Sequence, residues 1–213
     1  IFKDTQFDGV FHLAAQSHPP TSFRDPIGTM DTNVMGSANL FQVIQDFQDD
    51  CKVMFCSTSE VYGNVGSDGR KIRWDDTILP SNPYGASKAA TDVYLQERFA
   101  NGFMKGFITR AFSHTGPRRG RIFSISSDAY QIARMMRGYQ DPVLLVGNLS
   151  TTRVVMDVRD TVRAYYLAMV NPLVKDYVFN VCGDTPRKMQ YFTDKLIESV
   201  SYTHLTLPTR AQV

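Results

Sequence analysis

Short apolar runs alternate with longer segments of helical periodicity along most of this 213-residue chain. The apolar runs predict buried strands at Val10–Ala15, Lys52–Ser57, Gly106–Ala111, Pro142–Val146 and Tyr177–Val181. The periodic segments predict helices over residues 29–47, 84–100, 126–137 and 158–170, with a short one ending near residue 198. Strands that alternate with helices of this length predict βαβ units, and therefore a doubly wound parallel α/β sheet covered on both faces.

The composition excludes several classes of function. The chain has 23 basic and 21 acidic residues, a net charge of +2, so nothing indicates bulk attraction to nucleic acid or to a membrane surface. No apolar run approaches the ~20 residues that a membrane span needs. Cys51, Cys56 and Cys182 show no CxxC spacing, which favours a reducing, cytoplasmic location. The few scattered histidines indicate no metal site.

Both ends of the sequence are unusual. The chain begins without Met and enters a predicted strand almost at once, so we expect an N-terminal truncation that removes a first βα unit. Near the other end, Val200–Thr209 breaks the helical pattern and resembles a translated transposase sequencing adapter. We therefore expect residues 200–213 to be a non-native tail, the alternative being a genuine C-terminal segment.

Tyr84 and Lys88 give the strongest chemical signal. On a helix, residues four apart lie on one face, and a neighbouring cation favours phenolate, so we expect a Tyr84 pKa below the usual value of about 10. Such a pair alone is more often a solvated helix face. Here it follows Asn82-Pro83 at a predicted helix start, and Ser57–Glu60 ends the preceding strand. Polar clusters at the carboxyl ends of neighbouring parallel strands are typical of ligand sites.

These features resemble the short-chain dehydrogenases/reductases, whose signature is Tyr-x-x-x-Lys together with a Ser or Thr at a strand end. His12–Ser17, Asn33–Ser37 and Asn82–Gly85 are similar to the extended branch, which acts on nucleotide sugars. The similarity covers nearly all of residues 8 to 198. It implies a Rossmann-type fold, here N-terminally truncated, with a small C-terminal substrate-binding part.

The same resemblance implies how the chain is divided. Residues 1–199 are expected to form the catalytic, NAD(P)-binding domain, with substrate-binding segments at about 115–155 and 177–199 interleaved in it. The missing first βα unit would carry the glycine-rich cofactor loop. For these reasons the fragment alone is expected to be inactive, and the full-length enzyme is expected to be a homo-oligomer.

Two groups within the branch match different parts of the chain. Ser57–Gly63 and Pro117–Gly120 resemble the GDP-mannose 4,6-dehydratases, whereas Val143–Gly147 and residues 157–182 are more similar to the GDP-4-keto-6-deoxy-mannose reductases. The resemblance implies a lyase that dehydrates GDP-mannose, because elimination needs the carboxyl of Glu60. The alternatives are a reductase or related epimerase, and a non-catalytic module that binds a dinucleotide or nucleotide sugar.

Catalytic roles follow residue by residue from this resemblance. Thr58 would hydrogen-bond the sugar O4, and Tyr84 would take the O4 proton as hydride leaves C4. Lys88 would hold the nicotinamide ribose and tune Tyr84. Glu60 would handle the protons at C5 and C6 as water is eliminated. All four side chains are present, which disfavours the binding module.

The resemblance also implies which residues contact the ligands. The cofactor, NADP or NAD, would be contacted by Leu13, Ala14, Ala15, Gln16, Ser17, Lys88, His114 and Arg119. The nucleotide sugar, with GDP-mannose favoured, would be contacted by Ser59, Asn148 and Arg153. The guanidinium of Arg153 would grip the nucleotide diphosphate.

Some polar residues have plainer explanations. His12 lies inside an apolar strand, so we expect it to pack in the core. For Asn33 we expect a tie between backbone segments rather than substrate contact, and Gln16 could act in the same way. Gly63–Gly69 fits GxxGxxG, but the charged run of residues 70–76 follows it where a dinucleotide loop must open into an apolar helix. We expect a surface loop there, near the substrate.

Overall fold

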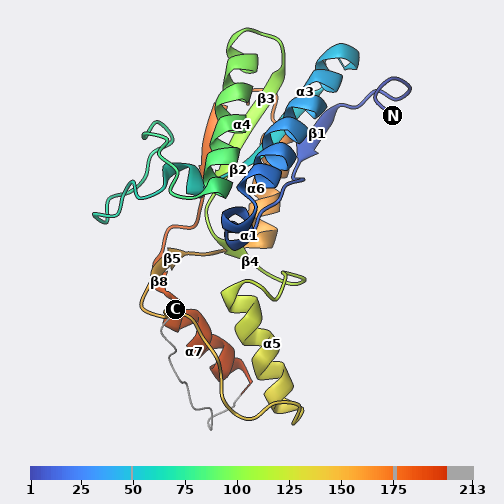
Figure 1. The fold of residues 1–213 in the computed structure, drawn as a ribbon. Helices are drawn as coiled ribbons and strands as arrows, with labels where there is room; N and C mark the ends of the chain where they lie inside the picture. Colours follow the sequence, from blue (N-terminus) through green and yellow to red (C-terminus); the bar gives the residue numbers. More distant parts are fainter. Residues whose placement is uncertain (49, 175–176, 201–213) are drawn as a thin grey trace. The chain divides into compact units, whose positions relative to one another are not determined.

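The computed structural model describes residues 1–48, 50–174 and 177–200. Apart from Val200, the expected non-native tail lies outside these residues. The chain divides into two compact units (Figure 1). The first comprises Ile1–Phe112 and Thr161–Val181, and the second comprises Ser113–Asp160 and the segment from Cys182 onward.

The first unit is built on a parallel sheet with the strand order β1-β2-β3-β7. Its strands are β1 (Gly9–His12), β2 (Lys52–Thr58), β3 (Lys105–Ala111) and β7 (Tyr177–Val181). Phe55 of β2 is in register with His12 of β1 and Ile108 of β3. The predicted parallel α/β architecture is confirmed.

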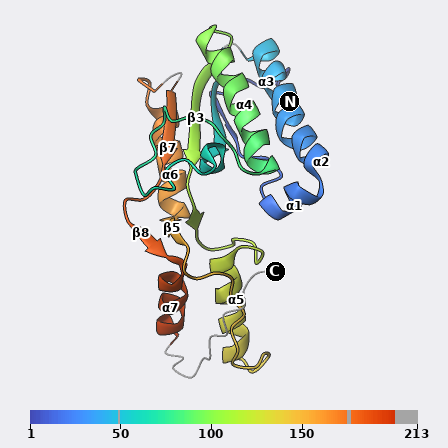
Figure 2. The ribbon, with the colours of Figure 1, turned by 60° about the vertical axis from the view of Figure 1, so that its left-hand side comes forward.

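Helices cover both faces of this sheet (Figures 1 and 2). On one face lie α3 (Gly36–Phe47) and α4 (Pro83–Ala100), and on the other lies α6 (Val158–Val170). The unit also contains α1 (Pro19–Arg24), α2 (Pro26–Met30), the π-helical turn η1 (Asp31–Met35) and the 3₁₀ helix η2 (Ser59–Tyr62). Successive strand residues point to opposite faces. Val53 and Phe55 accordingly pack with α3 and α4, whereas Met54 packs with Tyr165 of α6.

The second unit has a core between two helices, α5 (Ser124–Met136) and α7 (Met189–Ser199). Two small sheets complete it: a parallel pair of β4 (His114–Thr115) with β6 (Met156–Asp157), and an antiparallel pair of β5 (Thr152–Val154) with β8 (Pro186–Lys188). Segments far apart in the sequence therefore meet in this unit.

Two strand predictions need correction. Pro142–Val146 forms no strand, only isolated bridges at Val143 and Val146, because the run packs against the helices of the second unit through Leu144 and Val146 instead of joining a sheet. The strand predicted over Val10–Ala15 ends at His12. By contrast, β7 and α6 have the predicted bounds.

The glycine-rich segment after η2 is a loop, as predicted, with no helix before α4. Gly63 has a φ of 56°, and a Cβ there would lie 2.0 Å from the carbonyl oxygen of Leu79, so the turn requires glycine. No helix in the described part of the chain is long and apolar enough to cross a membrane.

Candidate active site

Four residues predicted to be catalytic meet in the first unit, where β2 ends and α4 begins. Asn82 connects two of the segments involved. Its Oδ1 accepts a hydrogen bond from the backbone N–H of Gly85 at 2.7 Å, which caps α4, and its Nδ2 donates to Oε2 of Glu60 at 2.8 Å. The carboxyl of Glu60 is thereby tied to the helix end that carries Tyr84.

The backbones in this corner lie very close together. A Cβ at Gly85 would lie 2.7 Å from the carbonyl oxygen of Glu60, so only glycine permits this packing. The backbone N–H of Tyr84 donates to Oγ of Ser22, on α1, at 3.0 Å. The side chain of Thr58, the last residue of β2, accepts from the N–H of Glu60 at 3.3 Å. These contacts fix the backbone positions of the side chains predicted to be catalytic.

Burial dominates the electrostatics of Tyr84. It raises the Tyr84 pKa to about 12, while a hydrogen bond with the Thr58 side chain acts in the opposite direction. The expectation of a lowered Tyr84 pKa is therefore wrong for this structure. The physical reason is that the free energy lost when a phenolate is removed from water exceeds the stabilisation that the nearby polar groups give it.

Lys88 is also buried, with 3% of its surface exposed, and burial lowers its pKa to about 8. Its ammonium lies 4.2 Å from the ring centroid of Phe55. None of the hydrogen bonds among the described residues involves this ammonium, although it carries three donors; since no fully buried side-chain nitrogen or oxygen lacks a partner there, its Nζ remains in reach of solvent or a ligand. A buried cation with unused donors fits a ligand that brings hydroxyl oxygens, such as the ribose of a dinucleotide.

The segment predicted to line the cofactor follows β1. In it, Leu13, Ala14 and Ser17 are exposed, and Ala15 and Gln16 are half-buried. The Gln16 side chain is engaged locally, since its Oε1 accepts from the backbone N–H of the residue two further on at 2.7 Å. This part of the chain can therefore face a ligand mainly with small and apolar groups.

Two plainer interpretations are confirmed. His12 is buried, with 7% of its surface exposed, and its Nε2 lies 2.8 Å from Oγ of Ser37. Asn33 is buried and ties backbone segments together: its Oδ1 accepts from the N–H of Gln16 at 2.8 Å, and its Nδ2 donates to Oγ of Ser87 at 2.8 Å.

The sequence reasoning missed a buried ion pair beneath the catalytic corner. Asp92 on α4 accepts bidentate hydrogen bonds from Arg110 on β3, both at 2.9 Å, and also accepts from Oγ of Ser57 at 2.7 Å. Arg110 further donates to the hydroxyl of Tyr62 at 2.9 Å. The only sequence signal was a charged residue inside the apolar run of β3. The pair anchors α4 to β3, and the hydrogen bond from Ser57 ties the same carboxylate to β2, the strand that ends in Thr58.

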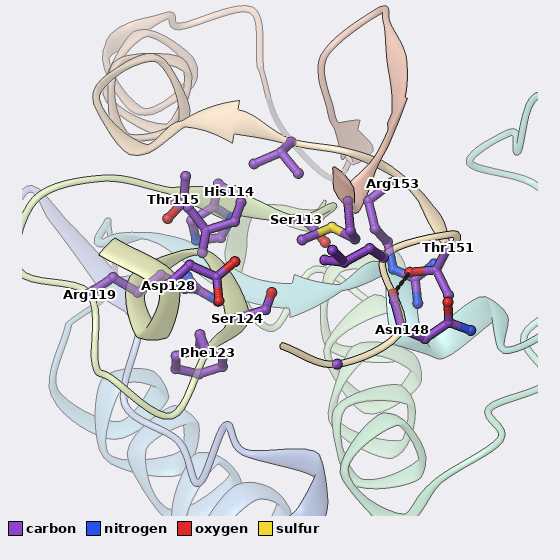
Figure 3. A pocket seen from close by; sticks show the side chains of 15 residues that line it. Ser113, His114, Thr115, Arg119, Phe123, Ser124, Asp128, Asn148, Thr151 and Arg153 are labelled. Atoms are coloured by element: carbon purple, nitrogen blue, oxygen red, sulfur yellow. Dashed lines mark hydrogen bonds between the residues drawn. The ribbon is translucent and has the colours of Figure 1, made fainter. Parts of the chain in front are cut away.

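The other predicted ligand contacts meet in a pocket of about 340 Å³ that lies wholly within the second unit (Figure 3). His114 and Arg119, expected at the cofactor, line it together with Asn148 and Arg153, expected at the substrate. Asp128 also lines this pocket, and the sequence reasoning did not single it out.

The pocket residues are held in different ways. Asn148 orders its own turn, since its Oδ1 accepts from the N–H of Ser150 at 2.9 Å. Arg153 is exposed, and its Nη1 donates to the carbonyl of Thr152 at 2.8 Å. Burial lowers the pKa of Arg119, whose guanidinium carbon lies 3.9 Å from the ring centroid of Phe123.

Ser59 and the question of a metal site complete the comparison with the predicted site. Ser59 begins η2 in the first unit, beside Thr58, and is half-buried. No group of three or more His, Cys, Asp or Glu residues that could hold a metal ion occurs in the part of the chain that the structure describes.

Residues 1–206 match a family model described as GDP-mannose 4,6 dehydratase. A GDP-6-deoxy-D-mannose reductase of Pseudomonas aeruginosa is 34% identical, over 90% of this chain and 62% of that protein. A GDP-mannose 4,6-dehydratase of Yersinia enterocolitica is 29% identical, over 84% of this chain and 48% of that protein. The chain thus spans less than two thirds of the length of these relatives.

Solved structures show the same relationship. The RMD protein of Pseudomonas aeruginosa, complexed with NADPH, superposes with a TM-score of 0.90 at 30% identity, covering 96% of this chain and 68% of that one. A dTDP-glucose 4,6-dehydratase from Streptomyces venezuelae, with NAD bound, gives a TM-score of 0.83 over 97% of this chain and 61% of that one. At its 23% identity the second match supports the fold alone.

Proposed function

The chain belongs to the GDP-mannose 4,6-dehydratase family, and we propose that it carries the catalytic residues for dehydrating GDP-mannose. The observation that carries this proposal is the position of Glu60. Its carboxyl lies two residues beyond Thr58 and is held by Asn82 at the start of the helix that bears Tyr84. Eliminating water across C5 and C6 needs such a carboxyl, whereas simple carbonyl reduction does not.

In the first step the hydroxyl of Thr58 hydrogen-bonds O4 of the sugar and Tyr84 removes the O4 proton. With a pKa of about 12, the phenolate of Tyr84 forms only at a cost. Lys88, four residues along the same helix, is the cation that we assign to reduce that cost. Its unused donors would also hold a ribose hydroxyl of the dinucleotide, NADP or NAD. A bound NADP or NAD would supply the acceptor for the hydride from C4 and the donor that delivers it to C6.

Glu60 carries out the second step. The ketone formed at C4 acidifies the proton on C5, and the Glu60 carboxylate abstracts that proton. The resulting carboxylic acid then protonates the C6 hydroxyl, which leaves as water. When hydride reaches C6, C5 takes up a proton, which balances the proton that Tyr84 took from O4. The net reaction is therefore a dehydration that needs no external reductant.

The pocket of the second unit is assigned to the nucleotide diphosphate. Arg119 and Arg153 line it, and guanidinium groups suit phosphate oxygens in both charge and geometry. The neutral side chain of Asn148 and the aromatic ring of Phe123 complete a lining that can take both a polar and a flat part of a ligand.

A second candidate function is favoured by the comparisons. The relative with 34% identity is named as a reductase, and it covers 90% of this chain. In a reductase, Tyr84 would donate a proton to the sugar carbonyl and Glu60 would have no chemical role. Glu60 therefore discriminates between the two candidates.

The test is Glu60→Gln in the full-length protein, because the amide keeps the shape but cannot abstract a proton. The variant should still oxidise C4, so bound reduced nicotinamide should accumulate while formation of 4-keto-6-deoxy product falls. Absorbance of reduced nicotinamide and product analysis after mixing with GDP-mannose measure both quantities. Glu97→Gln, which alters an exposed carboxyl on α4 away from the catalytic corner, is the matched control. Normal turnover by Glu60→Gln would favour the reductase.

A further inference from the structure

One acidic side chain lines the otherwise cationic pocket of the second unit. Asp128 lies on α5 with only 3% of its surface exposed, and its carboxyl points into the pocket (Figure 3). A carboxylate is an unexpected lining group for a site assigned to a diphosphate, because it repels phosphate oxygens. We therefore expect Asp128 to contact a part of the ligand other than the diphosphate, one that carries hydrogen-bond donors.

The surroundings of Asp128 leave it with unused acceptor capacity. Its Oδ2 accepts a hydrogen bond from Oγ1 of Thr193, on α7, at 2.8 Å. No Lys, Arg or His within the described ranges forms an ion pair with it. Burial raises the Asp128 pKa, since the charged form has lost water without gaining a cation. A carboxylate offers about four acceptor positions, so a ligand with two adjacent N–H donors would satisfy it.

We propose that Asp128 selects guanine as the base of the nucleotide in this pocket. Guanine presents N1–H and the N2 amino group side by side, and these two donors match the two oxygens of a carboxylate. The pairing edges of adenine, cytosine and uracil mix donors with acceptors, so one carboxylate oxygen would face an acceptor. The inference rests on the proposed function only in taking the pocket ligand to be a nucleoside diphosphate.

The arrangement of the pocket agrees with this orientation. Arg153 and Asp128 lie on opposite sides of it, which separates a site for the diphosphate from a site for the base (Figure 3). The ring of Phe123 lies on the Asp128 side, with Arg119 against it, and provides a flat surface beside which a base can stack. The volume of about 340 Å³ is within the range of small-molecule sites, roughly 300–1,000 Å³.

Calorimetric titration with a set of diphosphates tests the proposal without any turnover. The probes are GDP, IDP, which lacks the N2 amino group, XDP, which has an oxygen there, and ADP. The protein should bind GDP about tenfold more tightly than IDP and more tightly still than XDP or ADP. Asp128→Asn should lose about 10- to 100-fold in GDP affinity and should gain affinity for XDP, because the amide can donate to the xanthine oxygen.

Two variants separate recognition from folding. Asp141→Asn removes an exposed charge in the same unit outside the pocket, and should keep the wild-type order of affinities. Thr193→Val removes the hydroxyl that orients Asp128, and should weaken GDP binding while keeping GDP ahead of XDP. Thermal melting of each variant confirms that it is folded.

The outcomes distinguish the two proposals. Equal weakening of all four diphosphates in Asp128→Asn, or similar affinities for all four in the wild type, would overturn guanine selection and leave nucleotide binding intact. Failure of the wild type to bind any of the four would overturn both guanine selection and the proposed function.

Discussion

The catalytic corner of the first unit and the pocket of the second unit are built in opposite ways. The corner comes from two short stretches, residues 57–60 and 82–88. Thr58 and Lys88 are buried there and Glu60 and Tyr84 are half-buried, and hydrogen bonds tie the two stretches together. The pocket comes from three separated stretches within residues 113–128, 147–155 and 189, and its cation Arg153 is exposed. On the proposed function, the groups that exchange protons are partly shielded from water, whereas Arg153, which would grip a charged ligand, is exposed.

Because of this difference, substitutions in the two regions should affect different properties of the protein. Changes in the corner should alter the rate of the chemical step or the stability of the fold, because buried groups shift pKa and pair with one another. Changes in the pocket should alter affinity, because its residues meet the ligand from solvent.

Tyr84→Phe should remove the first proton transfer and reduce turnover by roughly 10²–10⁴-fold, the typical contribution of a positioned acid or base. Steady-state kinetics with GDP-mannose measure the effect. Tyr94→Phe deletes a phenol hydroxyl from the same helix, and should leave turnover unchanged. If both variants lost turnover equally, the loss would reflect a general sensitivity of α4 to substitution, and the acid–base role of Tyr84 would be contradicted.

Asp92→Asn should destabilise the first unit by about 3–5 kcal/mol, because it leaves the buried guanidinium of Arg110 without its counter-charge. Urea denaturation gives the change in free energy of unfolding. Asp75→Asn breaks an exposed pair with Arg73, and should produce no measurable change. A destabilisation by Asp92→Asn as small as that of the surface variant would contradict the anchoring role of the buried pair.

Stability should fall in mild acid because of His12. Burial first, and then the charge of Lys88, lower its pKa to about 4, whereas the unfolded chain protonates near 6.5. The folded state therefore resists a proton that the unfolded state accepts. The contribution is fully present above about pH 6.5 and is lost as the pH falls to about 4, by up to about 3 kcal/mol. Urea denaturation at several pH values measures this slope, which His12→Gln should remove between pH 4 and 6.5; an unchanged slope would refute the assignment to His12.

Arg153→Ala should raise the KM for GDP-mannose by about tenfold and leave kcat nearly unchanged, because it removes binding shared by the ground and transition states. Arg187, its register partner across β5 and β8, is also exposed but does not line the pocket. Arg187→Ala should therefore leave KM unchanged. A fall in kcat for Arg153→Ala would place the residue in the chemistry instead.

The first unit could be predicted from the sequence because its signals are local. An apolar run marks each strand, and Tyr84 and Lys88 share one helix, so spacing alone brings them to one face. The predicted bounds of α6 and β7 agree with the structure for the same reason. The short helix α1 was missed because its paired prolines, which here begin a helix, also fit a loop.

What could not be predicted depends on contacts between distant residues. Asp128 is oriented by a hydrogen bond from Thr193, 65 positions away, and Arg110 is neutralised by its ion pair with Asp92. Neither contact can be read from the sequence around these residues. The raised pKa of Tyr84 follows from burial, which the spacing between Tyr84 and Lys88 does not reveal. The apolar run at Pro142–Val146 matched a strand by composition, yet it packs against helices.

The path of the hydrogen from C4 tests the central claim most directly. GDP-mannose labelled with deuterium at C4 is supplied to the full-length protein with a catalytic amount of cofactor and no external reductant. The account predicts a 4-keto-6-deoxy product that carries the deuterium at C6, with no net change in reduced nicotinamide. Absence of that product, together with stoichiometric consumption of reduced nicotinamide on a 4-keto sugar, would contradict it and identify a reductase.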